Sequence, residues 1–150
     1  MKWLSLICAF ALSFTLAPAV SADATETSRE TDTHIFYFNV LNSAFLTPEI
    51  AQQYGINRSN YRAVLNLAVH EKTATGSKAI PVILEGSVTN IVQQQRALEF
   101  QEVNEGQALY YLSDFRITDD DLLTFKLLIK THADAPGYEL NFKRRVYTSK

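Results

Sequence analysis

Apolar and polar residues alternate along most of the chain after residue 33, with the period of two that is typical of strands half buried in a sheet. The clearest case is the segment in which Leu123, Phe125 and Leu127 alternate with Thr124 and Lys126. Similar alternation predicts seven strands, at residues 34–42, 61–70, 80–88, 96–103, 107–117, 123–130 and 138–146. Seven short strands separated by turns favour an all-β fold, an antiparallel β-sandwich over residues 34–150.

Turn-forming residues separate the predicted strands. Asn104-Glu105-Gly106 predicts a tight turn in which the glycine adopts a positive φ. Gly86 stands inside the predicted strand 80–88, where a glycine indicates a bulge or a bend.

One stretch, between the first and second predicted strands, has the end signals of a short helix. Thr47 is a suitable N-cap, a proline and an acidic residue follow it, and Gly55 suits the position after the last turn. Arg58 follows directly and is expected to hold the loop by bonding backbone carbonyls or Glu49. The alternative is a surface for a protein partner, made by Thr47, Glu49, Tyr54 and Arg58.

The N-terminus has the three-part layout of a secretory signal peptide, residues 1–22. Lys2 gives the positive region, an uncharged apolar run covers residues 3–16, and small residues precede a predicted cleavage after Ala22. The run is shorter than the roughly 20 residues that span a bilayer, and no second run of that length follows. We therefore expect no membrane span after cleavage. Residues 23–33 are polar and predict a flexible leader.

Composition excludes several classes of function. The formal net charge is −2, which offers no basic excess for a nucleic-acid backbone. Removing residues 1–22 takes away Lys2 and no acidic residue, so 128 residues remain with a net charge of −3. The single cysteine, Cys8, leaves with the signal peptide, which excludes a disulfide, thiol catalysis and thiolate metal ligation in the mature chain.

Three histidines are candidates for a metal site. His34, His70 and His132 begin or end predicted strands, and simple alternation of strand direction brings all three to the same end of the sandwich. With Asp134 or Glu71 they would then form a zinc or copper site. Their spacing matches no known ligand motif, and solvated surface histidines are the alternative. The sequence indicates no cofactor.

Two charged runs each have a functional and a structural interpretation. Asp119-Asp120-Asp121 could bind calcium, but it lacks the alternating ligands of an EF-hand loop and is also typical of a solvated turn. Lys143-Arg144-Arg145 could contact a phosphate or an anionic lipid. On a strand, however, Arg144 faces opposite to its two neighbours, as in a charged edge strand that resists aggregation.

Tyrosines and one asparagine are the remaining candidates. Tyr61, Tyr110 and Tyr111 either line a surface for a peptide or glycan, or anchor strands with the ring in the core and the hydroxyl at the edge. Asn66 lies among apolar residues of the second predicted strand, and its amide needs partners if that face is covered.

The helical stretch also carries a resemblance to a known family. Phe45-Leu46-Thr47-Pro48-Glu49-Ile50-Ala51-Gln52-Gln53-Tyr54-Gly55, with residues 65–69 and 105–112, resembles the domain-of-unknown-function family four-four-two-six, whose members are small uncharacterised bacterial periplasmic proteins. The similarity covers nearly all of the mature chain. It implies a periplasmic location and an immunoglobulin-like sandwich, and it implies no activity.

No catalytic motif is recognisable in the sequence. There is no Gly-x-Ser-x-Gly elbow, no His-Glu-x-x-His and no glycine-rich phosphate loop. We therefore favour a non-enzymatic binding or accessory module that contacts another envelope protein through sheet edges or the helical link. A small-ligand or metal-ion carrier is the alternative, and an unrecognised hydrolase ranks last.

Overall fold

The computed structural model describes residues 26–149, so the predicted signal peptide, residues 1–22, lies outside the described residues. The helical elements are a 3₁₀ helix η1 (Ser43–Phe45) and the helix α1 (Pro48–Gln53). The strands are β1 (Ser28–Glu30), β2 (His34–Asn42), β3 (Arg62–Thr73), β4 (Gly76–Ala79), β5 (Ile83–Thr89), β6 (Gln95–Ala97), β7 (Gln101–Glu105), β8 (Ala108–Arg116), β9 (Asp121–Lys130) and β10 (Tyr138–Val146).

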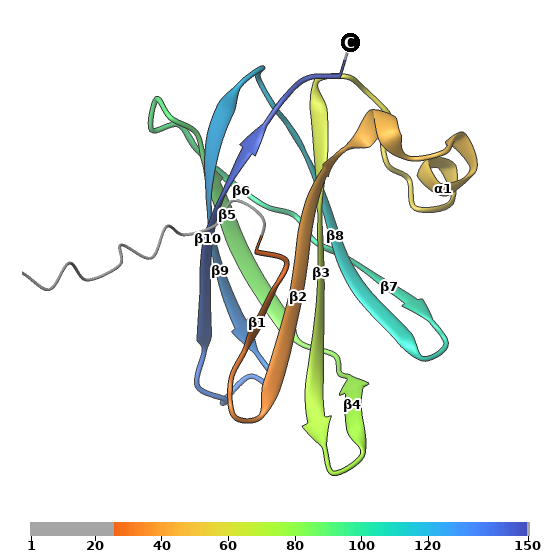
Figure 1. The fold of residues 1–150 in the computed structure, drawn as a ribbon, viewed down its shortest axis with the longest axis vertical. Coiled ribbons are helices and arrows are strands. Elements are labelled where there is room, and N and C mark those ends of the chain that lie inside the picture. The colour runs from red at the N-terminus through yellow and green to blue at the C-terminus, as the bar shows by residue number, and fades with distance from the viewer. Residues whose placement is uncertain (1–25, 150) are drawn as a thin grey trace, which may run out of the picture.

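The strands form two antiparallel sheets that pack face to face (Figure 1). Sheet A has the order β1-β2-β3-β8-β7, with β4 pairing with the far end of β3, and sheet B has the order β10-β9-β5-β6. This arrangement confirms the expected all-β sandwich with one short helix between β2 and β3. No helix among residues 26–149 is long and apolar enough to cross a membrane.

The inward-facing residues of both sheets make one apolar core. Leu65 and Leu67 of β3 belong to the same core cluster as Leu123 and Phe125 of β9, and all four are completely buried. Phe142 of β10 stacks on Phe125 with ring centroids 4.7 Å apart. Because residues of one strand point alternately to opposite faces, the same strands present their polar residues on the two outer faces. Those outer faces and the two ends of the sandwich are where functional sites can lie.

At two predicted strands the chain crosses from one sheet to the other. The segment expected as one strand at 80–88 is preceded by β4 in sheet A and becomes β5 in sheet B only at Ile83. Pro81 lies at the crossing, and it has no N–H for a ladder hydrogen bond. Likewise the segment expected at 96–103 divides into β6 of sheet B and β7 of sheet A. Alternation continued through both crossings, so periodicity alone could not reveal them.

The expectation of a flexible leader at 23–33 is wrong for Ser28–Glu30. These residues form β1, which pairs with β2 from Ser28↔Tyr37 to Glu30↔Ile35. A backbone ladder needs no apolar side chains, so a polar segment can add a strand where an edge is open. Arg29 strengthens this placement by donating from its Nη1 to the carbonyl of Asn141 in the other sheet, at 3.1 Å.

Candidate functional site

The chain crosses between β2 and β3 at one end of the sandwich, which we call the crossover end; it comprises residues 43–61 and the neighbouring segments 90–94, 117–120 and 147–149 (Figure 1). Buried polar side chains hold this crossing in place. Asn42 donates to the carbonyls of Asn60, at 2.9 Å, and Tyr147, at 3.3 Å. The completely buried Ser43 is within hydrogen-bond distance of the carbonyl of Asn57 and accepts from the N–H of Ser59.

The helix α1 has the ends that the sequence predicts. Thr47 accepts the N–H of Ile50 at 3.3 Å as N-cap, and Gly55 follows with φ of 62°. The Glu49 carboxylate accepts from its own N–H and from Thr47 and lies near Arg58, so the pKa of Glu49 is below its usual value. Arg58 donates to the carbonyl of Ala44 at 3.1 Å, which is the loop-holding role expected from the sequence.

Tyr54 connects α1 to the β7–β8 hairpin. Its hydroxyl donates to the carboxylate of Glu105, and this hydrogen bond raises the pKa of Tyr54. Of the four residues predicted as a partner surface, Thr47, Glu49 and Arg58 bond to the crossing itself and Tyr54 bonds to the hairpin. The arrangement fixes α1 against sheet A, and it leaves the apolar residues of the crossing free to face outward.

Exposed apolar side chains gather at the crossover end. Across the described residues, eight large apolar side chains are exposed, and six of them belong to this end. These six are Phe45, Ile50, Tyr61, Ile91, Val92 and Tyr147. Phe45 is 74% exposed and Tyr61 is 65% exposed. Sequence reasoning missed this set of residues, because they lie in three separate segments that show no periodicity, and only the strand register brings these segments to the same end.

Hydrogen bonds join these loops to one another. Asp121, which is buried, accepts the N–H of Ile91 at 3.2 Å and the hydroxyl of Thr118 at 3.0 Å. Asp119 accepts the N–H of Thr148 at 2.9 Å. The three aspartates expected as a possible calcium site therefore have separate structural partners, since Asp120 pairs with Arg145 at 2.6 Å.

The three candidate histidines do not converge. His34 and His132 line one cavity of about 380 Å³ at the end of the sandwich opposite the crossover end, with the apolar Phe36 and Ile129. His34 pairs with Glu71, and the side chains of these two residues share one face of sheet A. His70 is next to Glu71 along β3, so its side chain points to the opposite face. Within residues 26–149, no group of three His, Cys, Asp or Glu side chains is placed to hold a metal ion. The convergence that the sequence suggested is wrong.

The basic run in β10 divides between the two faces, as expected. Arg144 points inward and is buried, and its guanidinium lies 5.6 Å from the ring centre of Phe38 and 5.3 Å from that of Phe142. Its Nη1 donates to the carbonyl of Lys143 at 3.0 Å. Together with Arg29, which bonds the carbonyl of Asn141, it occupies acceptors along the open edge of β10. This supports the role of a protected edge strand.

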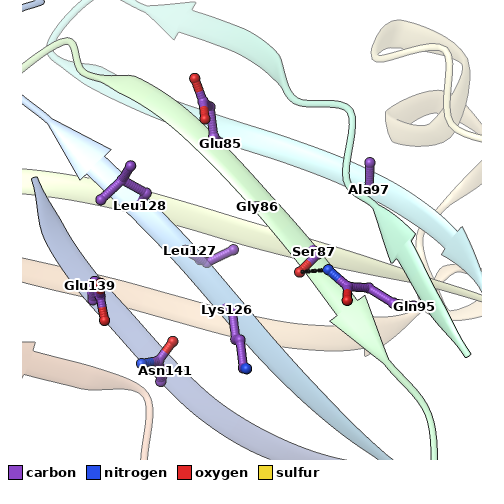
Figure 2. A pocket seen from close by; sticks show the side chains of 10 residues that line it. All are labelled: Glu85, Gly86, Ser87, Gln95, Ala97, Lys126, Leu127, Leu128, Glu139 and Asn141. Carbon is purple, nitrogen blue, oxygen red and sulfur yellow. Dashed lines mark hydrogen bonds between the residues drawn. The ribbon is translucent and has the colours of Figure 1, made fainter. Parts of the chain in front are cut away.

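A polar hollow of about 610 Å³ lies on the outer face of sheet B (Figure 2). The strand register places Glu85 and Glu139 on either side of Leu128, and Ser87 beside Lys126 in the next row. Gln95 donates to Ser87 at 3.1 Å across one side. Acidic and basic side chains both line the hollow, around smaller residues. Among the described residues, no nucleophile in it is hydrogen-bonded to a base.

A second outer-face cavity, of about 400 Å³, lies on sheet A. It contains Tyr37 of β2, Asn66 and His70 of β3, and Tyr110 of β8. Tyr110 points outward, whereas Tyr111 points inward and its hydroxyl bonds the N–H of Val82 and the carboxylate of Glu102, both at 2.9 Å. The predicted tyrosine surface thus exists only in part: Tyr110 is joined by Tyr37, which sequence reasoning passed over, and Tyr61 lies at the crossover end.

Comparisons with known proteins agree with this fold. Residues 28–149 match the family model described as a domain of unknown function, DUF4426. A crystal structure of a DUF4426 family protein from Pseudomonas aeruginosa PAO1 is similar at a TM-score of 0.71 and 26% identity, covering 82% of this chain and 95% of that chain.

A more distant structure is that of FetP from the uropathogenic Escherichia coli strain F11, recombinantly expressed in the periplasm of E. coli. It is similar at a TM-score of 0.60 and 8% identity, covering 82% of this chain and 94% of that chain. This likeness concerns the fold alone. None of the curated proteins matches the chain.

Proposed function

The chain belongs to the DUF4426 family, a domain of unknown function, and we propose that it is a non-enzymatic binding module whose crossover end contacts another protein of the bacterial envelope. The observation that carries this proposal is the gathering of exposed apolar side chains at that end. Single exposed apolar residues are ordinary on a protein surface, but the location of six of the eight at one end of the sandwich supports an interaction site there.

The residue types at the crossover end suit a protein interface. Phe45, Tyr61 and Tyr147 give large apolar areas with few rotatable bonds, and tyrosine is enriched among residues that dominate binding energy. The loops that carry them are joined by the hydrogen bonds of Asn42 and Ser43. A surface that is already ordered loses less conformational entropy when it binds, so this end is prepared for a partner.

Charge at the crossover end is balanced. Asp120 pairs with Arg145, Asp121 is buried, and Arg62 and Arg116 lie beside Tyr61. Without a surplus of Lys and Arg, this end offers no basic cluster for anionic headgroups, which supports a protein partner over a lipid surface.

The proposed location is the periplasm. The signal-peptide layout of residues 1–22 supports it. In such a compartment an accessory domain meets its partner as a folded protein, which requires a surface that is formed before contact.

Site-specific photocrosslinking tests the proposed contact. A photoreactive phenylalanine analogue is placed at Phe45 or Tyr61 in the full-length chain and expressed in its native host; the control position is Ile83, which is 46% exposed and lies at the other end of the sandwich. We expect one discrete crosslinked species from Phe45 and Tyr61 and none from Ile83. Mass spectrometry then identifies the crosslinked protein, and Tyr61→Ala should weaken its binding about tenfold or more.

The proposal fails if Phe45 and Tyr61 give no discrete product, or the same products as Ile83. Crosslinking to lipid in place of protein would also overturn it.

The cavity lined by His34 and His132 favours a second candidate function, a small-ligand carrier. It lies between the sheets, it is lined mainly by apolar side chains, and no Lys, Arg, Asp or Glu lines it. Native mass spectrometry of the protein purified from its host would show a bound mass if it carries a ligand there. The loss of that mass in Phe36→Ala, with the sandwich still folded, would assign the ligand to this cavity.

A further inference from the structure

The cavity on the outer face of sheet A lies where strand β8 leaves strand β3. Pairing between these strands ends at Leu67↔Tyr111, and from His70 onward β3 pairs with β4. The next outward residues on either side of the fork are Ala68 and Tyr110. Ala68 also pairs with Tyr37 on β2. A small side chain therefore lies between two tyrosines, and it leaves a hollow of about 400 Å³.

The two tyrosines line the cavity from strands on opposite sides of β3. Neighbouring paired strands lie about 4.8 Å apart, so the two backbones are at least roughly 10 Å apart. His70 holds the Tyr37 ring by an edge contact, with centroids 5.1 Å apart at 76°. Tyr37 remains 41% exposed, so its ring is accessible to a ligand in the cavity.

The polar groups of the cavity include amides and an imidazole, which are suited to bonding hydroxyl groups. Asn39 and Asn66 form a cross-strand pair at one side, and His70 lies at the other, where its Nδ1 is 3.1 Å from the hydroxyl of Ser77. The carbonyl oxygen of the Asn66 side chain is buried and has no hydrogen-bond partner. A buried acceptor without a donor is destabilising and is uncommon in native proteins.

We propose that this cavity binds one pyranose ring of an uncharged glycan. A pyranose has apolar C–H faces for the Tyr37 and Tyr110 rings and hydroxyl groups at its edge for the Asn39 and Asn66 amides. No Asp, Glu, Lys or Arg lines the cavity, so a uronic acid or a phosphate would lose its hydration without a charged partner. The site is separate from the crossover end, and either proposal can fail without the other.

Saturation-transfer NMR with a panel of neutral oligosaccharides, including maltotriose and N,N′-diacetylchitobiose, tests the site on the folded mature chain. We expect saturable transfer to the pyranose protons of at least one member. Tyr37→Ala and Tyr110→Ala should each weaken that binding tenfold or more, whereas Tyr37→Phe, which keeps the ring, should stay within about threefold. Tyr61→Ala removes an exposed tyrosine at the crossover end and serves as the control.

Asn66→Ala separates a ligand role from a structural one. If the amide is kept for a ligand, the variant binds the sugar at least tenfold more weakly and melts at the same or a higher temperature than the wild type. A lower melting temperature with unchanged sugar binding would show that the amide is structural and would overturn its assigned role.

Three results would overturn the glycan proposal as a whole. The first is the absence of saturable binding across the panel, and the second is binding that Tyr37→Ala leaves unchanged. The third is binding of phenol in the cavity without binding of any sugar, which would assign the site to small aromatic molecules.

Discussion

At the scale of single residues, the role of a residue depends on the residues that the fold packs against it. Gly86 is the clearest example, because the sequence predicts a bend there while β5 runs through it without interruption. The absence of a Cβ leaves space for the side chains of Leu127 and Phe100. A Cβ at this position would lie 2.4 Å from Cδ2 of Leu127 and 3.3 Å from the ring of Phe100. The glycine therefore permits close packing of the core against β5.

Gly86→Ala should destabilise the protein by about 1 to 3 kcal/mol, the usual effect of overpacking a core. Gly137→Ala is the matched control, because its Cβ would meet Leu128 at the same 2.4 Å but that leucine is only partly buried and can turn aside. Urea unfolding of both variants measures the difference. Equal midpoints for Gly86→Ala and the wild type would contradict the packing role.

The raised pKa of Tyr111 predicts that the protein loses stability in alkaline solution. Burial, and then the neighbouring Glu102 carboxylate, raise the pKa of Tyr111 above its ordinary value, although the N–H of Val82 acts in the opposite direction. The unfolded chain then loses this proton at a lower pH than the folded chain, so stability is present below about pH 10 and falls as the pH rises further.

Tyr111→Phe should reduce this alkaline fall, which thermal melts between pH 8 and 11 would measure. At neutral pH the same variant should cost about 1 to 3 kcal/mol, because the N–H of Val82 loses its acceptor. An alkaline fall of unchanged size in the variant would assign the effect to other groups.

At the scale of the elements, the sequence predicts strands better than it predicts their partners. The alternation at 34–42, 123–130 and 138–146 corresponds closely to β2, β9 and β10, and the cap residues correctly define α1. The crossings at Pro81 and between β6 and β7 were not predictable, because a strand that changes sheets keeps its period of two. The polar strand β1 was missed since its stability comes from backbone pairing.

The edge of β10 yields a prediction at this scale. Arg29 bonds the Asn141 carbonyl on the open side of β10, and an open edge invites pairing with another chain. Arg29→Ala should therefore increase self-association with little change in stability, because its ion pair with Glu26 is partly exposed.

Light scattering over a range of concentrations measures the effect of Arg29→Ala. Arg145→Ala is the control, because it removes the same charge from the outer face of β10, where Arg145 pairs with Asp120. Equal association by both variants would attribute the effect to net charge.

At the scale of the whole molecule, register decides which candidate residues meet. Tyr37, Asn66 and Tyr110 are far apart in the sequence and line one cavity, whereas His34 and His70 are cross-strand neighbours that face opposite ways. The sequence names Asn66 and Tyr110 as residues of interest, but it contains no signal that joins them to Tyr37. Both proposed surfaces therefore depend on long-range pairing, and local patterns show only their separate parts.

The order of strands in sheet B also sets the order in which the chain can fold. Strand β5 pairs on one side with β9, and β9 pairs with β10. This side of β5, residues 83–89, therefore cannot pair until residues 121–146 have been synthesised. In the same way, β3 cannot pair with β8 until β8 has been synthesised. During synthesis, the apolar faces of the early strands are only partly covered until β9 and β10 emerge. A nascent chain of this protein stays open to chaperones, and to aggregation, until nearly all of it has been made.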